Sequence, residues 1–431
     1  MTIKKSITTV TCVVAMILAF SCNSVDKKLN NATIIKEQSN LKAKDILGNP
    51  NYPAISYGGY RAKSRTIQPT LPELKRDMKL LYAMGIRIIR TYNVQPELPH
   101  ASNILKAIDD LKKEDPTFEM YVMLGAWIDC KDAWTEKTPN HEIESAQNEG
   151  EIARAVALAN KYPDIVKVVA VGNEAMVRWA ASYFVRPHVI LKWVNHLQGL
   201  KKAGELPKDL WITCSDDFAS WGGGDKSYRV KELEDIIKAV DYVSMHTYAY
   251  HNSHYNPMFW KVPDNEDNLS DIEKIDAAML RALEFAQTQY NDVSEFVKSI
   301  DSTKTIHIGE TGWATTSNGH YGVNGSRATD EYKQGLYYQH LREWTDKEGI
   351  SCFYFEAFDE QWKDVQNAEG SENHFGMINL KGEAKYAIWN LVDKGVFKGL
   401  TRLGKPITKT YNGNKDALLK YVFVPNTEYQ R

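Results

Sequence analysis

The chain has 431 residues and a formal net charge of −2, with 43% hydrophobic and 25% charged residues. This composition is typical of a globular protein, and the small net charge without a long basic run argues against a nucleic-acid partner. The 11 Trp and 23 Tyr are a large aromatic supply. Most of them must be core, but such a supply also suits a cleft in which sugar rings stack on aromatic faces.

The first residues resemble an export signal of the bacterial lipoprotein type. Lys4 and Lys5 precede the apolar run "TVTCVVAMILAF" (9–20), which is too short to span a bilayer as a stable helix. The segment "AFSC" then ends at Cys22, which we expect to be lipidated after removal of residues 1–21. Cleavage of a plain secretory signal nearby is the alternative. The lipoprotein interpretation predicts an exported protein anchored to a membrane of the cell envelope, periplasmic or surface-exposed, with a polar tether over residues 22–48.

Eight short β-type runs then alternate with amphipathic stretches. We expect strands at 54–59, 86–92, 119–127, 166–173, 210–216, 241–248, 304–310 and 352–358. Several are continuous apolar runs, as in parallel strands that are buried on both faces. Helical patterns lie at 71–85, 142–162, 188–204, 270–300 and 330–349.

This alternation predicts an α/β fold with a single catalytic domain, a (β/α)8 TIM barrel over residues 49–400. Residues 401–431 would form a C-terminal extension that packs on the barrel. A doubly wound open sheet is the alternative, but it would want a glycine-rich phosphate turn after its first strand, and "ISYGGYR" contains no G-x-G-x-x-G.

Three cysteines remain once Cys12 and Cys22 are assigned to the leader. Cys130, Cys214 and Cys352 are far apart, lack metal-type spacing and lie in or beside apolar runs. An odd number without a framework pattern argues against a disulfide scaffold. We expect them to be small core residues.

Two of the expected strands end in glutamate. The fourth ends in "VAVGNEAMVRW", which places Asn173 and Glu174 at the barrel mouth, and the seventh ends in "HIGETGW" (307–313), which places Glu310 there. Catalytic groups of such barrels lie at the carboxyl ends of the strands. A pair of carboxylates across a cleft is what cleavage of a glycosidic bond requires. The alternative is that each glutamate forms an ion pair within the barrel.

These segments resemble glycoside hydrolase family 17, the β-1,3-glucanase family. "VAVGNEAMVR" is similar to its acid/base segment and "IHIGETGWATTSNG" to its nucleophile segment. "IRIIRTYN" resembles its second strand, and "CFYFEAFDEQWK" with "HFGMINLKGEAKY" resembles its last strand and the segment that follows. Gln361 departs from the proline that is frequent in the family, whereas Trp362 and Lys363 are kept.

The resemblance implies a role for each of these residues. Glu310 would be the nucleophile and Glu174 the acid/base, with a pKa raised by burial and by the charge of Glu310. Asn173 would hydrogen-bond the sugar 2-hydroxyl, and Tyr248 would donate a hydrogen bond to Glu310. Glu356 and Lys363 would complete a charge network beside the nucleophile.

Aromatic residues near the strand ends are candidates for sugar contacts, with core packing as the alternative for each. Trp313 is the first candidate, followed by Tyr57, Tyr92, Trp127, Phe358 and Trp362. Asp129 and Asp216 are candidates for hydrogen bonds to sugar hydroxyls, although loop solvation explains them as well.

The segment "HTYAYHNSHY" places His246, His251 and His254 close together, but their spacing fits no standard zinc pattern. We therefore expect no metal and no cofactor. The sequence predicts a monomeric, retaining β-1,3-glucan hydrolase that acts within laminarin-like chains. One alternative is a β-1,3-glucan transglucosylase that uses the same two glutamates. The other is a non-catalytic surface glucan-binding lipoprotein, which we would expect to have lost one of them.

Overall fold

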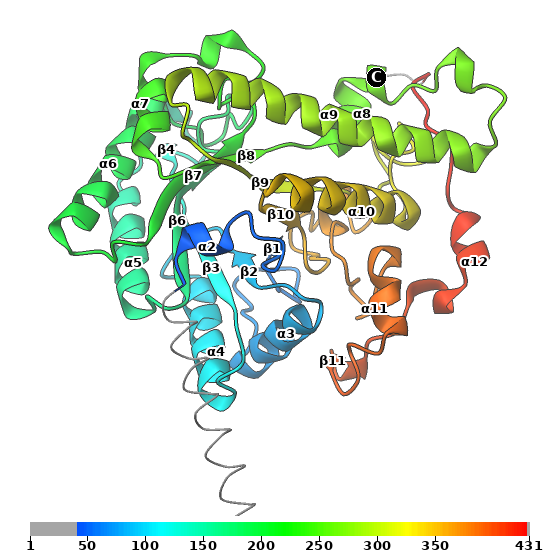
Figure 1. Cartoon of the computed structure of the whole chain (residues 1–431), viewed down its shortest axis with the longest axis horizontal. Coiled ribbons are helices and arrows are strands. Elements are labelled where there is room, and N and C mark those ends of the chain that lie inside the picture. The colour runs from blue at the N-terminus through cyan, green and yellow to red at the C-terminus, as the bar shows by residue number, and fades with distance from the viewer. Residues whose placement is uncertain (1–40, 429–431) are drawn as a thin grey trace, which may run out of the picture.

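The structure is a computed structural model that describes residues 41–428. Eight parallel strands form a closed barrel in the order β1-β10-β9-β8-β7-β6-β3-β2 (Figure 1). They are β1 (Ala54–Ser56), β2 (Ile88–Arg90), β3 (Tyr121–Ala126), β6 (Val166–Asn173), β7 (Trp211–Asp217), β8 (Val243–His246), β9 (Ile306–Gly312) and β10 (Cys352–Phe355). Each overlaps one of the eight expected strand segments, so the predicted (β/α)8 barrel is confirmed, although β1, β2, β8 and β10 are shorter than expected.

Helices between the strands cover the outside of the barrel, as Figure 1 shows. They are α3 (Leu71–Ala83), α4 (His100–Glu114), α5 (Asn148–Lys161), α6 (Pro187–Ala203), α7 (Lys231–Ala239), α8 (Ala249–Tyr255), α9 (Asp271–Ile300) and α10 (Glu331–Glu348). Their ends follow local chemistry. Ser270 and Glu273 form a capping box at the start of α9, and α10 ends at Gly349, whose φ of 65° suits glycine.

The helix expected over 142–162 begins later than the pattern indicated. Residues Asn140–Glu144 form β5, which pairs with β4 (Cys130–Lys131) in a hairpin after β3, and α5 starts only at Asn148. The Glu144 carboxylate accepts a hydrogen bond from Trp193 Nε1 at 2.7 Å and pairs with Lys192, both on α6. These tertiary contacts outweigh the local helical pattern at residues 142–144.

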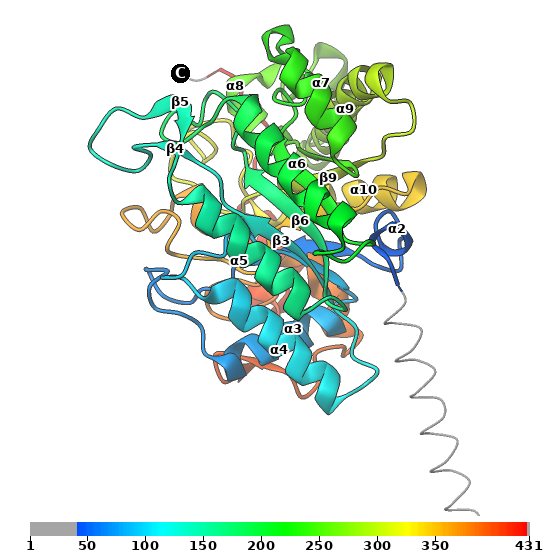
Figure 2. The same ribbon diagram turned by 90° about the vertical axis from the view of Figure 1, so that its left-hand side faces the viewer.

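The two ends of the barrel differ. At the end where the strands begin, α2 (Ala43–Ile46) packs on inward-facing residues that include Tyr121, Tyr242 and Phe353. The β4–β5 hairpin lies on the opposite side of the molecule from α2, where the strands end (Figure 2). The base is therefore a packed core, and the carboxyl ends of the strands are free to form a site.

The residues after β10 extend along the barrel wall (Figure 1). They form α11 (Trp389–Asp393), the β11 (Thr401–Arg402) and β12 (Lys405–Pro406) hairpin, and α12 (Lys415–Leu419). Arg402 forms a buried ion pair with Asp77 of α3, with 2.6 Å between Nη1 and Oδ1. Lys333 of α10 donates to the carbonyl of Phe423 at 2.8 Å.

Cys130, Cys214 and Cys352 are buried and free, in keeping with their expected place in the core. No helix within residues 41–428 is long and apolar enough to cross a membrane. Cys22, the predicted signal peptide and residues 22–40 of the predicted tether lie outside the described residues.

Candidate active site

Glu174 and Glu310 face each other across the mouth of the barrel. Glu310 belongs to β9, and Glu174 directly follows β6. One oxygen of each carboxylate and one ring nitrogen of His246 all lie within 4.8 Å of one another. The fold therefore brings together two carboxylates that are 136 positions apart in the sequence.

A bulge at the end of β6 lets two consecutive side chains point into the mouth. The register between β6 and β7 shifts between Ala170 and Asn173, and Gly172 and Glu174 have positive φ values of 81° and 47°. In a regular strand, Asn173 and Glu174 would point to opposite faces. The left-handed backbone at Glu174 is unusual for a residue with a side chain, and such conformations concentrate at functional sites.

Glu310 is surrounded by hydrogen-bond donors. Arg90 Nη1 donates to Oε2 at 2.7 Å, Tyr92 Oη donates to the same oxygen at 3.1 Å, and Tyr248 Oη donates to Oε1 at 2.6 Å. Burial would raise the pKa of Glu310, but the Arg90 guanidinium and the Tyr248 hydroxyl lower it below its ordinary value. Glu310 is thus held as an anion.

Glu174 has the opposite environment. Burial, and then the negative charge of Glu310, raise its pKa to about 8. Oε1 lies 3.0 Å from Nδ1 of His246, whose Nε2 lies 2.8 Å from Ser215 Oγ. Burial lowers the pKa of His246 to about 4, so the ring is neutral at pH 7 and does not stabilise a charge on Glu174. Of the two glutamates, Glu174 is the one that carries a proton near neutral pH.

Arg90 connects the two halves of the site. Its Nη2 donates to Asn173 Oδ1 at 2.5 Å while Nη1 binds Glu310. Because a guanidinium can only donate hydrogen bonds, this contact orients the Asn173 amide and leaves its NH2 group as the donor for a ligand.

Among the described residues, one group has the donor atoms and spacing that could hold a metal ion, and it consists of Glu174, His246 and Glu310. Arg90 already supplies the positive charge beside Glu310, and the neutral His246 is hydrogen-bonded to Glu174 and Ser215. This donor set fits a proton-transfer pair better than a cation site. His251 contacts the Tyr321 hydroxyl at 3.1 Å instead, so the three histidines of the quoted segment do not share one site.

Lys363 lies between two buried carboxylates after β10. Its Nζ is 2.5 Å from Glu356 Oε1 and 3.6 Å from Glu360 Oε2. Its charge also helps to lower the pKa of Glu310. The predicted network of Glu356 and Lys363 is therefore present beside Glu310, with Glu360 as a third member.

A cleft of about 710 Å³ crosses the mouth above these groups. Its lining includes Glu310 and Asn173. Tyr60, Phe355 and Trp362 come from the ends of β1 and β10 and the segments after them, whereas Trp127, Trp134 and Tyr183 come from the segments after β3 and β6. Tyr92, Trp127 and Trp362 are partly exposed on its walls, so their predicted contact with sugar stays a prediction.

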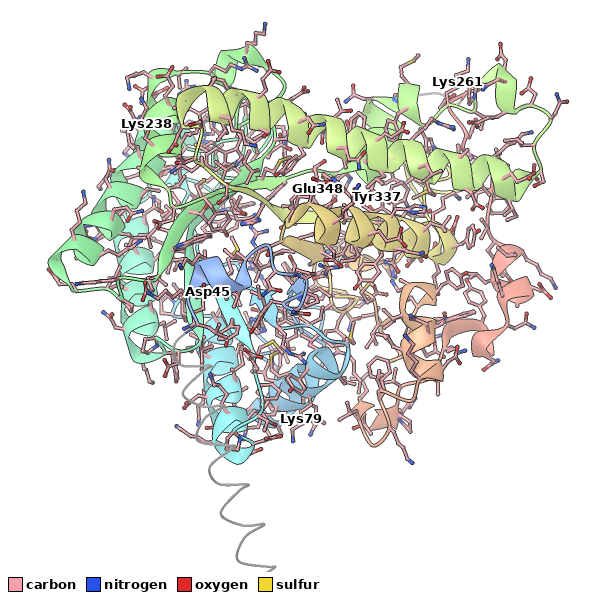
Figure 3. The ribbon with its side chains drawn as sticks, in the orientation of Figure 1. Asp45, Lys79, Lys238, Lys261, Tyr337 and Glu348 are labelled. Carbon is pink, nitrogen blue, oxygen red and sulfur yellow. The ribbon has the colours of Figure 1, made fainter. Side chains whose placement is uncertain are left out.

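Three aromatic candidates do not offer a ring face to the cleft. The prediction for Trp313 is wrong, because the side chain is fully buried, its Nε1 donates to the Ala328 carbonyl at 2.7 Å, and its ring lies 5.0 Å from that of Tyr337. Tyr337 belongs to α10, on which Figure 3 labels it. Phe358 is buried under Arg402, whose guanidinium lies 3.5 Å from the ring centroid. Tyr57 borders the cleft but is 1% exposed, and its hydroxyl donates to Asp77.

The two aspartates also differ from each other. Asp216 is buried and accepts a hydrogen bond from the Met176 backbone N–H at 2.7 Å, so it supports the segment after Glu174 and does not face a ligand. Asp129 is partly buried and accepts a hydrogen bond from Trp127 Nε1 at 3.3 Å.

Four features of the site were not predicted from the sequence: Arg90, Glu360, Trp134 and the contact of His246 with Glu174. Arg90 had a visible signal, since it is a charged residue within an otherwise apolar strand and is 1% exposed. The contacts of His246 and Trp134 depend on how loops meet across the barrel, and no spacing in the sequence reveals them.

The barrel, the two carboxylates with opposite protonation and the aromatic cleft together define a glycoside hydrolase. Residues 54–376 match the model of the BtgE/BtgC glycoside hydrolase domain. The chain belongs to glycoside hydrolase family 17, the β-1,3-glucanase family.

Relatives with known structures or curated names fit this family. The crystal structure of an endo-laminarinase from Formosa Hel1_33_131 is 63% identical, with a TM-score of 0.88 over 91% of this chain and 100% of that one. "Probable glucan endo-1,3-beta-glucosidase btgC" of Aspergillus flavus is 24% identical over 83% of this chain and 46% of its own. A family 17 β-1,3-glucanosyltransferase from Rhizomucor miehei, 18% identical over 78% of this chain and 96% of its own, shares the fold with a TM-score of 0.52. The chain spans about half the length of the curated relatives it matches first.

Proposed function

We propose that this enzyme hydrolyses internal β-1,3-glucosidic bonds of laminarin-like glucan with retention of the anomeric configuration. The observation that carries the proposal is the facing pair of Glu174 and Glu310, within 4.8 Å and with opposite pKa shifts. Retaining glycosidases hold their carboxyl groups about 5–5.5 Å apart, whereas inverting enzymes leave roughly 6.5–9.5 Å for a water molecule. Similarity to the Formosa endo-laminarinase supports β-1,3-glucan as the substrate.

In the first step, Glu310 attacks the anomeric carbon and Glu174 gives its proton to the departing glycosidic oxygen. The C–O bond to the leaving sugar breaks as the ester bond to Glu310 forms. In the second step, ionised Glu174 takes a proton from water, whose oxygen attacks the same carbon and releases Glu310. The Asn173 NH2 group would donate to the 2-hydroxyl, a contact that strengthens in the transition state.

The test is product analysis on laminarin, mixed-linkage glucan and cellulose, with NMR of the first anomer released. We expect cleavage of laminarin to mixed-length oligosaccharides of retained configuration. An inverted first product would contradict the role of Glu310. Products that are mainly longer than the substrate would reveal the alternative, a transglucosylase that uses the same residues.

Two variants assign the glutamates. Glu310→Ala and Glu174→Ala should each lose most of the turnover, on the order of 10³-fold or more. Azide should rescue Glu174→Ala on a substrate with a good leaving group, because a small nucleophile can enter the space left by the acid/base. Trp179 is exposed in the segment that follows Glu174. Trp179→Ala is therefore the matched control and should retain wild-type turnover.

We also propose that Cys22 carries the lipid anchor. The motif "AFSC" after a short apolar run supports this assignment. Radioactive palmitate should label the full-length protein in cells, and Cys22→Ala should abolish the label. Labelling that survives the substitution would contradict the anchor.

A further inference from the structure

The β4–β5 hairpin places an exposed tryptophan in the lining of the cleft. Trp134 lies in its turn and is 61% exposed, one of the most exposed large apolar side chains of the described residues. It lines the cleft together with Trp127 and Tyr183. A large apolar ring exposed at the edge of a binding cleft is a candidate contact surface.

The three rings form a continuous group. Trp134 stacks on Tyr183 with 5.0 Å between ring centroids and 20° between planes, and Trp127 lies 5.1 Å from Tyr183 and 6.2 Å from Trp134. Tyr183 is almost buried, so it supports the other two rings. We call Trp127, Trp134 and Tyr183 the aromatic platform.

Hydrogen bonds fix the platform in place. Asp129 accepts a hydrogen bond from Trp127 Nε1 at 3.3 Å. The Asn148 side chain in turn binds both the N–H and the carbonyl of Asp129. The Cys130 N–H donates to the Tyr183 carbonyl at 3.1 Å and ties the hairpin to the segment after Glu174. The platform is therefore held before any ligand arrives, which lowers the entropy cost of binding.

The barrel topology assigns the platform to one side of the reaction. Trp127 follows β3, which pairs with β6, and Tyr183 lies in the segment that follows Glu174 itself. Tyr60 and Trp362 follow β1 and β10, and β10 pairs with the nucleophile strand β9. The proton donor must face the oxygen of the leaving sugar, so the side of the cleft nearest Glu174 receives the leaving part of the chain.

We propose that the aromatic platform binds the glucose units on the leaving side of the cleaved bond, and that it retains a sugar there long enough for its hydroxyl to compete with water for the glycosyl-enzyme. This inference rests on the proposed β-1,3-glucan hydrolase activity. In the competing step, Glu174 takes the proton of the acceptor hydroxyl, whose oxygen forms the new glycosidic bond as the ester bond to Glu310 breaks.

The test compares wild type with Trp134→Ala on reducing-end-labelled laminarihexaose and on laminaritriose. We expect KM for the hexaose to rise on the order of 10-fold, with a smaller rise for the triose, which offers fewer leaving-side units. The cut positions should shift so that fewer units lie on the leaving side. The fraction of longer-than-substrate products at high oligosaccharide concentration should fall several-fold.

Trp179→Ala serves as the matched control, because Trp179 is 64% exposed in the segment after Glu174 but does not line the cleft, and it should behave as wild type. Trp362→Ala, in the segment after β10, should shift the cut positions in the opposite direction. If the wild type is active and Trp134→Ala has the same KM and cut positions, the role of the aromatic platform is contradicted but the proposed function is not. A wild type inactive on every laminari-oligosaccharide overturns the proposed function as well.

Discussion

At the scale of single residues, the two glutamates of the site have different hydrogen-bond partners and different protonation states. Glu310 accepts hydrogen bonds from an arginine and two tyrosines, whereas Glu174 contacts a neutral histidine. Placed in low-dielectric surroundings, the first remains an anion and the second keeps its proton. Arg90 is central to this difference because it binds Glu310 directly and orients Asn173 at the same time.

These protonation states predict a bell-shaped pH dependence of kcat/KM on laminarin. Glu174 acts as an acid only while protonated, so activity should fall as pH rises through about 8. Glu310 attacks only while ionised, and its pKa lies below the ordinary value, so the acid limb should lie below about pH 4.5. Tyr248→Phe removes a hydrogen bond that favours the anion and should move the acid limb upward. An acid limb that stays in place would contradict this role of Tyr248.

Trp313 gives a second prediction at this scale. Because it is a core residue, Trp313→Ala should lower the free energy of unfolding by about 3–5 kcal/mol, measured by denaturant titration. Trp313→Phe should be milder and leave KM for laminari-oligosaccharides near the wild-type value. A stable Trp313→Phe variant with a strongly raised KM would instead support the sugar platform that the sequence suggested.

At the scale of elements, the carboxyl ends of β7, β8 and β9 are interlocked. Ser215 Oγ contacts both Ser244 Oγ, at 2.9 Å, and His246 Nε2, at 2.8 Å. Gly309 lies against these hydroxyls, since a Cβ there would be 2.1 Å from Ser244 Oγ and 2.5 Å from Ser215 Oγ. The glycine before Glu310 thus allows the close approach that links β9 to the groups behind Glu174.

Gly309→Ala should therefore cost about 1–3 kcal/mol of stability by overpacking, and should lower kcat by displacing the Ser215–His246 contacts. The measurements are thermal unfolding and initial rates on laminarin. Gly199→Ala is the matched control, because Gly199 lies in α6 with open space around it and should be neutral or stabilising by up to about 1 kcal/mol. Equal behaviour of the two variants would show that β9 tolerates a side chain at Gly309.

At the scale of the whole molecule, the C-terminal extension completes the barrel wall. Arg402 reaches Asp77, which is fully buried and also binds Arg61 at 2.9 Å and Tyr57 at 3.0 Å. The extension therefore neutralises a charge in the wall of the catalytic domain and covers Phe358.

Arg402→Ala should lower the free energy of unfolding by up to about 3 kcal/mol, because it weakens a buried ion pair while Asp77 keeps Arg61. Thermal unfolding monitored by circular dichroism measures the loss. Lys405→Ala, an exposed cation on the same hairpin, should change stability by less than about 0.5 kcal/mol. A chain that ends at residue 400 should be less stable than Arg402→Ala, and a truncated chain with wild-type stability would contradict the role of the extension.

The sequence by itself determined the barrel and the meeting of two glutamates at its mouth. Strands buried on both faces leave apolar runs, helix ends leave capping residues, and a barrel places every strand end on one rim, so Glu174 and Glu310 could be paired without coordinates. The segments around them carried the likeness to family 17, because the chemistry is tied to those strand ends.

Only the tertiary structure decided what surrounds the pair. The partners of Arg90, the neutral His246 between Glu174 and Ser215, and the burial of Trp313 and Phe358 all depend on contacts between residues far apart in the chain. The platform of Trp127, Trp134 and Tyr183 arises where a hairpin turns back over the mouth. The second strand of that hairpin includes the first residues of the helical pattern expected at 142–162. Periodicity indicates which face of an element is apolar, but it does not indicate which loop covers that face. The covering loop decides whether a tryptophan is buried or can contact a sugar.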